Sequence, residues 1–387
     1  MKRKKNPYAD LPVTWQRVFY MALSAVWYLL QLSSAVILGF ILFGSGKKNE
    51  RKRSFFHHYM WYLYRLDMRL MPGVKHRIYN PYKEEFNRGA IIVCNHQSFL
   101  DSVYMIVLSP RILIVTNDNV WKNKFIHRIL GFADFFPISR GIENSVSFFR
   151  EYVNMGYSVA IFPEGERSDN CSVLRFHRGA FYLAEQLGAD ILPVFLHGTG
   201  YVMPKGCNWI NKGRILIEIG QRIPPGSSNT YPERTRRIGQ YYRQHYEELC
   251  LSVETASYFH AFVVELYGYT GIRMQRKVGT LLKRYADFSA WVDAACVRGT
   301  VLVLHDAWGV IGMLFALVHP DKQVVSTGNE WFVRTLAVKC NSLPDNLILL
   351  SGSTPEAAQL RESILVIFRP TAEDRITYRI YDPVIIE

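Results

Sequence analysis

Residues 91–101 read Ile91-Ile-Val-Cys-Asn-His-Gln-Ser-Phe-Leu-Asp101, a short apolar run followed directly by polar residues. Such a run, rich in β-branched residues, predicts a buried strand. The strand would end just before His96, and Asp101 stands five residues later, where a helix could begin. If the chain turns into that helix, the carboxylate can reach back to the imidazole. The pattern therefore predicts a strand, loop and helix of an α/β fold with a His–Asp pair at the turn.

A second apolar run, Val159–Phe162, is followed by Pro163-Glu-Gly-Glu-Arg-Ser168. This motif would lie at the carboxyl end of a strand, where open α/β sheets bind ligands. Gly165 permits close approach of the backbone, and Arg167 offers a planar fork for a phosphate. Any single arginine could be a solvated surface charge, but several follow apolar segments and together predict an anion pocket: Arg140, Arg167, Arg175 and Arg178.

The segment from about 74 to 225 alternates short apolar runs with helix-like stretches, which predicts an α/β domain with a largely buried sheet. A polar helix is expected to follow at 232–251. The expected strands are 90–94, 112–115, 158–162, 191–195 and 215–219, and the expected helices between them include 143–155 and 178–187.

The N-terminal region contains Val18–Gly44, a run of 27 residues without a charged side chain. As a helix it would be about 40 Å long, more than the roughly 30 Å hydrocarbon core of a bilayer. Basic clusters flank it on both sides, and the aromatic and basic segment 55–71 that follows suits the headgroup region. We expect a membrane-anchoring helix that either spans the bilayer or lies in one leaflet. The alternative is a buried helix of a soluble core.

The composition is basic: the 387 residues carry a formal net charge of +13. That charge suits nucleic acid, an anionic membrane or a phosphorylated substrate. Much of the basic excess flanks the apolar segment and no nucleic-acid motif is present, so we expect no nucleic-acid partner. The six cysteines are scattered without a CxxC pair, which indicates neither zinc nor a disulfide framework and favours a reducing compartment.

The expected chemistry of His96 is that of a general base. A neutral imidazole has a pKa near working pH, and a carboxylate such as Asp101 fixes its tautomer and stabilises its cation. The pair could thus activate a substrate hydroxyl, with Asn95 and Ser98 shaping the loop. The alternative is a loop histidine bonded only to backbone.

Four blocks in order resemble the glycerolipid acyltransferases, most of all the 1-acyl-glycerol-3-phosphate acyltransferases: Asn95-His-x4-Asp101, Phe136–Arg140, Phe162–Ser168 and Ile191–Val194. The resemblance covers about residues 74–225 and implies a mixed sheet. It implies that His96 is the base and Asp101 its orienting partner. The substrate-binding candidates are Asn95, Ser98, Arg140, Glu164, Gly165, Arg167, Ser168 and Arg178.

The resemblance implies transfer of an acyl group to the sn-2 hydroxyl of a lysophospholipid at a membrane, with the active site on the cytoplasmic side. The donor would be acyl-coenzyme A or acyl-carrier protein, with no cofactor or metal. Two departures leave the acceptor open, because Glu166 replaces a common threonine and Ser139 a common acid. An acyl-amino-acid lipid is an alternative acceptor, and a non-catalytic lipid-binding or assembly protein is an alternative of another class.

Residues 255–387 show a second α/β pattern, Rossmann-like, with strands expected at 300–304, 323–326, 346–350, 364–368 and 376–381. Its first strand and loop resemble those of S-adenosylmethionine-dependent methyltransferases. Val303 stands in place of the strand acid, and only Gly309 of the expected glycines remains. We therefore expect a degenerate domain without its cofactor that serves interaction, the alternative being retained methyl transfer. The predicted domains are 1–73 (membrane anchor), 74–254 (acyltransferase) and 255–387.

Overall fold

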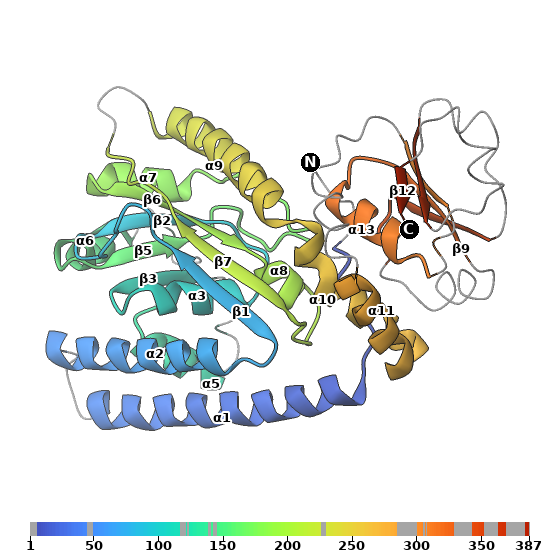
Figure 1. Cartoon of the computed structure of the whole chain (residues 1–387). Coiled ribbons are helices and arrows are strands. Elements are labelled where there is room, and N and C mark those ends of the chain that lie inside the picture. The colour runs from blue at the N-terminus through green and yellow to red at the C-terminus, as the bar shows by residue number, and fades with distance from the viewer. Residues whose placement is uncertain are drawn as a thin grey trace. The chain divides into compact units, whose positions relative to one another are not determined.

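The computed structural model describes residues 6–44, 49–116, 121, 124–137, 141, 145–225, 230–284, 300–304, 306, 308–328, 343–351, 363–368 and 384–386. The chain divides into two compact units, one formed by residues 16–246 and the other by 1–15 together with 247–387 (Figure 1). The domain boundaries predicted from sequence, after residues 73 and 254, remain predictions.

The first unit is built on a seven-stranded sheet in the order β1-β7-β6-β2-β5-β3-β4. Neighbouring strands are parallel except β6 and β7, which pair antiparallel, so the predicted mixed sheet is confirmed. The strands are β1 (Val74–Tyr79), β2 (Ala90–Cys94), β3 (Ile112–Thr116), β4 (Phe136–Pro137), β5 (Ser158–Ile161), β6 (Asp190–His197) and β7 (Gly213–Ile219).

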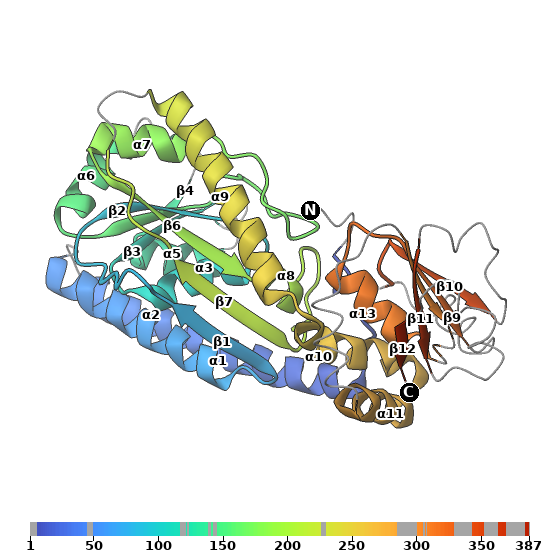
Figure 2. The ribbon, with the colours of Figure 1, turned by 45° about the horizontal axis from the view of Figure 1, so that its top comes forward.

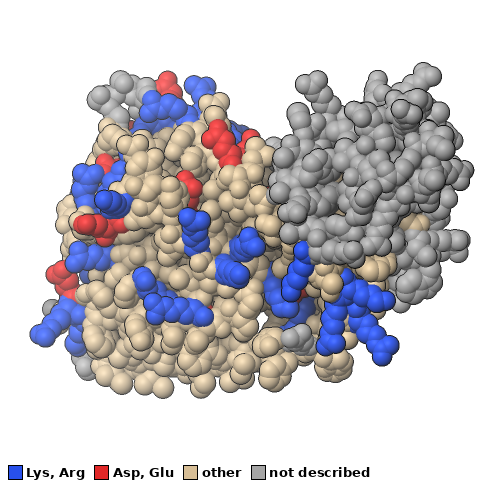
Figure 3. Space-filling model, in the orientation of Figure 1, with Lys and Arg blue, Asp and Glu red and all other residues tan. Residues whose placement is uncertain are grey.

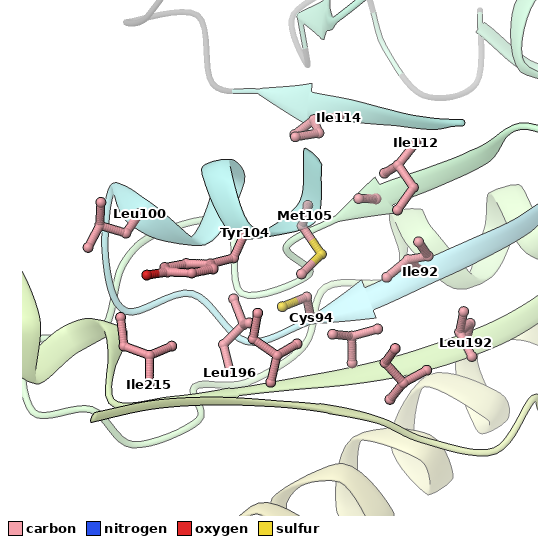
Figure 4. Packing of buried hydrophobic residues seen from close by; sticks show 14 of the residues in the cluster. Ile92, Cys94, Leu100, Tyr104, Met105, Ile112, Ile114, Leu192, Leu196 and Ile215 are labelled. Carbon is pink, nitrogen blue, oxygen red and sulfur yellow. The ribbon is translucent and has the colours of Figure 1, made fainter. Parts of the chain in front are cut away.

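Strand β2 occupies the centre of this sheet, hydrogen-bonded to β5 on one side and β6 on the other. All five of its residues are buried, as its unbroken apolar sequence requires of a strand covered on both faces. Figure 4 shows Ile92 and Cys94 packed against Tyr104 and Met105 of the helix that follows. This core fixes the position at which β2 ends, and therefore the position of the loop that begins with Asn95.

Helices cover both faces of the sheet (Figures 1 and 2). One face carries α1, α2, α3 and α5, and the opposite face carries α6, α7 and α9. Their bounds are α1 (Trp15–Phe43), α2 (Glu50–Leu70), α3 (Leu100–Leu108), α5 (Lys124–Phe132), α6 (Val146–Asn154), α7 (Gly179–Leu187) and α9 (Tyr231–Val253), with the short α8 (Thr199–Val202) between β6 and β7.

Helices α1 and α2 form an antiparallel hairpin. Phe43 contacts Phe56 near the connection, and far from it the Trp27 indole donates a 2.7 Å hydrogen bond to Asp67. The segment Arg17–Phe43 is long and apolar enough to cross a membrane, and only 22% of its apolar window is buried. It is therefore not the enclosed helix of a soluble core. Figure 3 shows its outer edge almost without charged side chains.

The second unit contains α10 (Ala256–Leu266), the 3₁₀ turn η3 (Tyr267–Thr270), α11 (Ile272–Arg284), α13 (Val310–Val318) and a second sheet. The sheet order is β10-β9-β8-β11-β12, with every neighbouring pair parallel. The predicted strand 376–381 lies outside the described residues. The strands are β8 (Thr300–Leu304), β9 (Val324–Gly328), β10 (Leu347–Ser351), β11 (Ser363–Phe368) and β12 (Val384–Ile386).

Candidate active site

The structure brings His96 and Asp101 together at the carboxyl end of β2. His96 lies in the loop, Asp101 lies in the first turn of α3, and the His96 Nδ1 atom is 2.9 Å from Asp101 Oδ2. Asp101 is fully buried, whereas the His96 side chain keeps 21% of its surface exposed. Because the carboxylate accepts a hydrogen bond from Nδ1–H, the lone pair of Nε2 is left free to take a proton. The pair therefore has the arrangement of an oriented general base.

Asp101 also holds the loop that carries His96. Its Oδ2 accepts hydrogen bonds from the backbone N–H groups of Gln97 at 2.6 Å and Ser98 at 2.8 Å. The Phe162 ring stacks on the imidazole, with centroids 4.4 Å apart and an interplanar angle of 23°. The imidazole is thus restrained at one nitrogen by the carboxylate bond and across its face by an aromatic ring.

Three polar residues predicted to bind substrate are buried and bonded to the protein. The Asn95 side chain exchanges two hydrogen bonds with the Leu196 backbone, which ties the end of β2 to β6. The Ser98 hydroxyl donates to the Met203 carbonyl at 2.8 Å, and the Ser168 N–H donates to the His96 carbonyl at 2.8 Å. In this arrangement they position the loop that carries His96.

Glu164 connects the second motif to the first. It is buried, and its two carboxylate oxygens accept hydrogen bonds from the backbone N–H groups of His96 and Leu174, each at 2.8 Å. Burial raises the pKa of this carboxyl group to about 8, although the two backbone bonds pull the pKa the other way. Gly165 follows with a φ of 74°, and an added Cβ would lie 3.2 Å from the His177 ring. A side chain at this position would be strained and crowded.

The predicted phosphate-binding arginines differ in how far they are exposed to solvent. Arg167 is half-buried in the loop after β5, while Arg178 is exposed at the start of α7. Arg140 and Ser139 lie outside the described residues. Glu166, the unusual acid of this motif, is 70% exposed and lies 3.5 Å from the Lys205 ammonium group. Its charge is therefore directed to solvent and to a cation.

Two tyrosines of α9 support the site and were not predicted. The Tyr242 hydroxyl accepts a hydrogen bond from the Asn95 N–H and donates toward Asn95 Oδ1 and the Val194 carbonyl. Tyr246 accepts a 2.6 Å bond from the Gln97 side chain. Their spacing of four residues on a polar helix was the available signal. This spacing indicates that both tyrosines lie on one face of the helix, but it does not indicate that this face contacts the loop that carries His96.

Residues 75–197 match a family model described as Acyltransferase, and this segment contains the whole His96–Glu164 constellation. Among curated proteins, a 1-acyl-sn-glycerol-3-phosphate acyltransferase of Chlamydomonas reinhardtii is 29% identical over 37% of this chain and 44% of its own length. The chloroplastic enzyme LPAT1 of Arabidopsis thaliana is 31% identical over 35% of this chain and 39% of its own length. The chain thus spans less than half the length of these two relatives.

The 1-acyl-sn-glycerophosphate acyltransferase PlsC of Thermotoga maritima has a similar fold, with a TM-score of 0.50 at 19% identity over 60% of this chain and 98% of that one. A 1-acyl-sn-glycerol-3-phosphate acyltransferase of Helicobacter pylori is 30% identical over 42% of this chain and 73% of its own length. With that coverage and the matching family model, the chain belongs to the acyltransferase family.

Proposed function

We propose that this protein is an O-acyltransferase that moves a fatty acyl group from a thioester to the free sn-2 hydroxyl of a 1-acyl-glycerol-3-phosphate. The observation that carries the proposal is the 2.9 Å bond between His96 and a buried carboxylate, which leaves Nε2 as the basic nitrogen. The relatives named above are acyltransferases for this acceptor. Acyl-coenzyme A or acyl-carrier protein would supply the acyl group.

In the proposed reaction, His96 Nε2 takes the proton of the acceptor hydroxyl as its oxygen attacks the thioester carbon. The imidazolium, stabilised by Asp101, then returns the proton to the departing thiolate as the carbon–sulfur bond breaks. The guanidinium of Arg167 would hold the acceptor phosphate, since its planar fork matches phosphate oxygens. Side chains alone supply this chemistry, and we propose neither a cofactor nor a metal.

The α1–α2 hairpin supports a membrane location in which α1 lies along one leaflet. A spanning α1 would draw its antiparallel partner into the hydrocarbon with Arg53, Arg65 and Asp67, which is energetically unfavourable. An α1 lying in the interface instead buries its exposed apolar side chains and leaves α2 on the protein side. We propose that the active site faces the cytoplasm. The exposed apolar side chains include Phe19, Leu23, Val26, Leu30, Ile37 and Ile41.

For the second unit we propose a methyltransferase-like Rossmann fold that has lost its cofactor and serves interaction. The parallel order β10-β9-β8-β11-β12 supports the fold, because it is the doubly wound order 3-2-1-4-5. The contacts of Asp306 support the proposed loss of the cofactor. The Asp306 carboxylate accepts hydrogen bonds from the Gly312 N–H at 2.7 Å and the Ser326 hydroxyl at 3.0 Å. The start of α13, where a ligand group would bind, is thus already capped by the chain's own acid.

The test is acyl transfer by the purified chain carrying His96→Ala. Loss of the base should lower the rate by about 10²-fold or more while the circular dichroism spectrum stays unchanged. His58→Ala, on the exposed face of α2, is the control and should keep full activity. A His96→Ala enzyme with near-normal rate would refute the mechanism. A panel of lysolipids, including acyl-amino-acid lipids, identifies the acceptor, and transfer to none of them would favour a lipid-binding protein.

A further inference from the structure

A basic groove of about 1070 Å³ lies between the segment 175–178 and residues 232–243 of α9. Four arginines line it and one acid, Glu233, which is engaged by the N–H and hydroxyl of Thr230 at the start of the helix. Among the described residues, none of the four guanidinium groups has an ion pair or hydrogen bond. The arginines are Arg175, Arg178, Arg236 and Arg243. Four unpaired cations around one hollow predict a ligand with several negative charges.

The groove adjoins the catalytic loop. The His177 N–H, in the groove wall, donates a 2.7 Å hydrogen bond to the Pro163 carbonyl, and the His177 ring approaches Gly165. The Leu174 N–H, just before this wall, donates to Glu164, which in turn holds the His96 backbone. Arg167 does not line the groove. A ligand in the groove would therefore lie next to the reacting centre without occupying the site proposed for the acceptor phosphate.

The groove faces away from the membrane helix. It is formed beside α7 and α9, whereas α1 and α2 cover the opposite face of the sheet (Figures 1 and 2). A lipid headgroup held at the α1 surface cannot reach across the sheet, so the ligand must come from water. The groove volume is slightly above the roughly 300–1,000 Å³ typical of small-molecule sites. These features favour a small polyanion over a membrane surface.

We propose that this groove binds the nucleotide part of a coenzyme A thioester, through its pyrophosphate and its phosphate monoester. This rests on the proposed acyl transfer, which needs a thioester. The donor would lie across the carboxyl edge of the sheet, its acyl tail toward the α1–α2 face and its phosphates among the arginines. The thioester carbon would then lie between them, at the loop that carries His96.

The test compares Arg236→Ala/Arg243→Ala with Arg237→Ala, an exposed arginine of the same helix that does not line the groove. In calorimetric titrations of the full chain, the double variant should bind coenzyme A at least about tenfold more weakly, and Arg237→Ala should bind it normally. In transfer assays the double variant should raise the KM for acyl-coenzyme A by a similar factor with kcat within about twofold. With acyl-pantetheine, which lacks the nucleotide, all three proteins should behave alike.

Unchanged coenzyme A binding by the double variant would overturn the proposal. So would an equal loss with acyl-pantetheine, or a defect seen only with acyl-carrier protein, which would assign the groove to an acidic protein. Should the unaltered chain transfer no acyl group, the proposed function fails, but the coenzyme A titration still decides whether the groove binds a nucleotide.

Discussion

At the scale of single residues, spacing predicted that His96 and Asp101 lie together, but it did not predict the hydrogen-bond partners of their neighbours. His96 and Asp101 meet because a strand ends and a helix begins within five residues, which is visible in the sequence. Asn95 and Ser98 carry polar side chains beside the base, so they were expected to contact substrate. Their observed partners are carbonyls at Leu196 and Met203, about a hundred residues away, and no local pattern reports such contacts.

Asp101→Asn tests how the base is oriented. The amide keeps the size of the side chain but loses the negative charge that stabilises the imidazolium. In the unaltered chain, Asp101 Oδ2 accepts hydrogen bonds from His96 and from the Gln97 and Ser98 N–H groups. We expect the transfer rate to fall by about 10²-fold or more, since the imidazolium that forms during the reaction loses its counterion and the amide no longer fixes the tautomer. Asp169→Asn, at a side chain 82% exposed, is the matched control. A near-normal transfer rate for Asp101→Asn would argue against the orienting role.

Glu164 predicts a pH dependence of stability. Burial raises its pKa from an ordinary 4.5 to about 8, so the folded chain holds a proton that the unfolded chain releases. This group's stabilising contribution is therefore complete below pH 4.5 and is lost as pH rises toward 8, at up to about 1.4 kcal/mol per pH unit. Urea unfolding between pH 5 and 8 should show a flatter trend for Glu164→Gln than for Glu166→Gln, whose carboxylate is exposed. Equal slopes would contradict the shift.

At the scale of elements, apolar runs located the buried strands and missed the exposed ones. The runs at 90–94 and 191–195 became β2 and β6, because strands covered on both faces are continuously apolar along the buried run. Strand β1, with the sequence Val-Lys-His-Arg-Ile-Tyr, escaped prediction. It lies at the edge of the sheet, where charged residues are tolerated, and pairing with β7 rather than hydrophobicity holds it in place.

The same limit applies to the N-terminal helix. Residues 18–44 predicted a long apolar helix, but the sequence left open whether that helix spans the bilayer or lies in one leaflet. The antiparallel contact between α1 and α2, seen in the bond from Trp27 to Asp67, supports the proposal that α1 lies in one leaflet, through the charge argument above. The contact joins residues 40 positions apart and could not be read from either helix alone.

Cysteine labelling can test the orientation of α1. Trp15→Cys and Glu50→Cys lie just beyond the two ends of the apolar stretch and are exposed. In sealed vesicles, a membrane-impermeant maleimide added outside should label both variants equally, because a helix in one leaflet leaves its ends on the same side. The parent chain gives the background of its six cysteines. Labelling of only one variant before the vesicles are opened would show that α1 crosses the bilayer.

At the scale of the whole molecule, the chain joins two units with separate sheets. The four blocks that resemble acyltransferases all lie in the first unit, and the family model matches residues 75–197 of that unit. In the second unit the expected strands 300–304 and 364–368 correspond to β8 and β11. Sequence alone could not show that Asp306 caps α13, because a carboxylate after a strand suits a ligand site equally well.

Asp306→Ala tests whether the stability of the second unit is independent of the activity of the first. The carboxylate is fully buried and burial raises its pKa, while it accepts bonds from the first residues of α13 and from Ser326. Removing it leaves buried donors unpaired, which costs on the order of 1–3 kcal/mol for each. We expect calorimetry to show a lower melting temperature for one transition, with the rate of acyl transfer unchanged, whereas Asp321→Ala, at a half-exposed site, should alter neither. If the unaltered chain melts at a higher temperature with S-adenosylmethionine, the cofactor site is intact and the proposed loss is wrong, because only a ligand that binds the folded state raises that temperature.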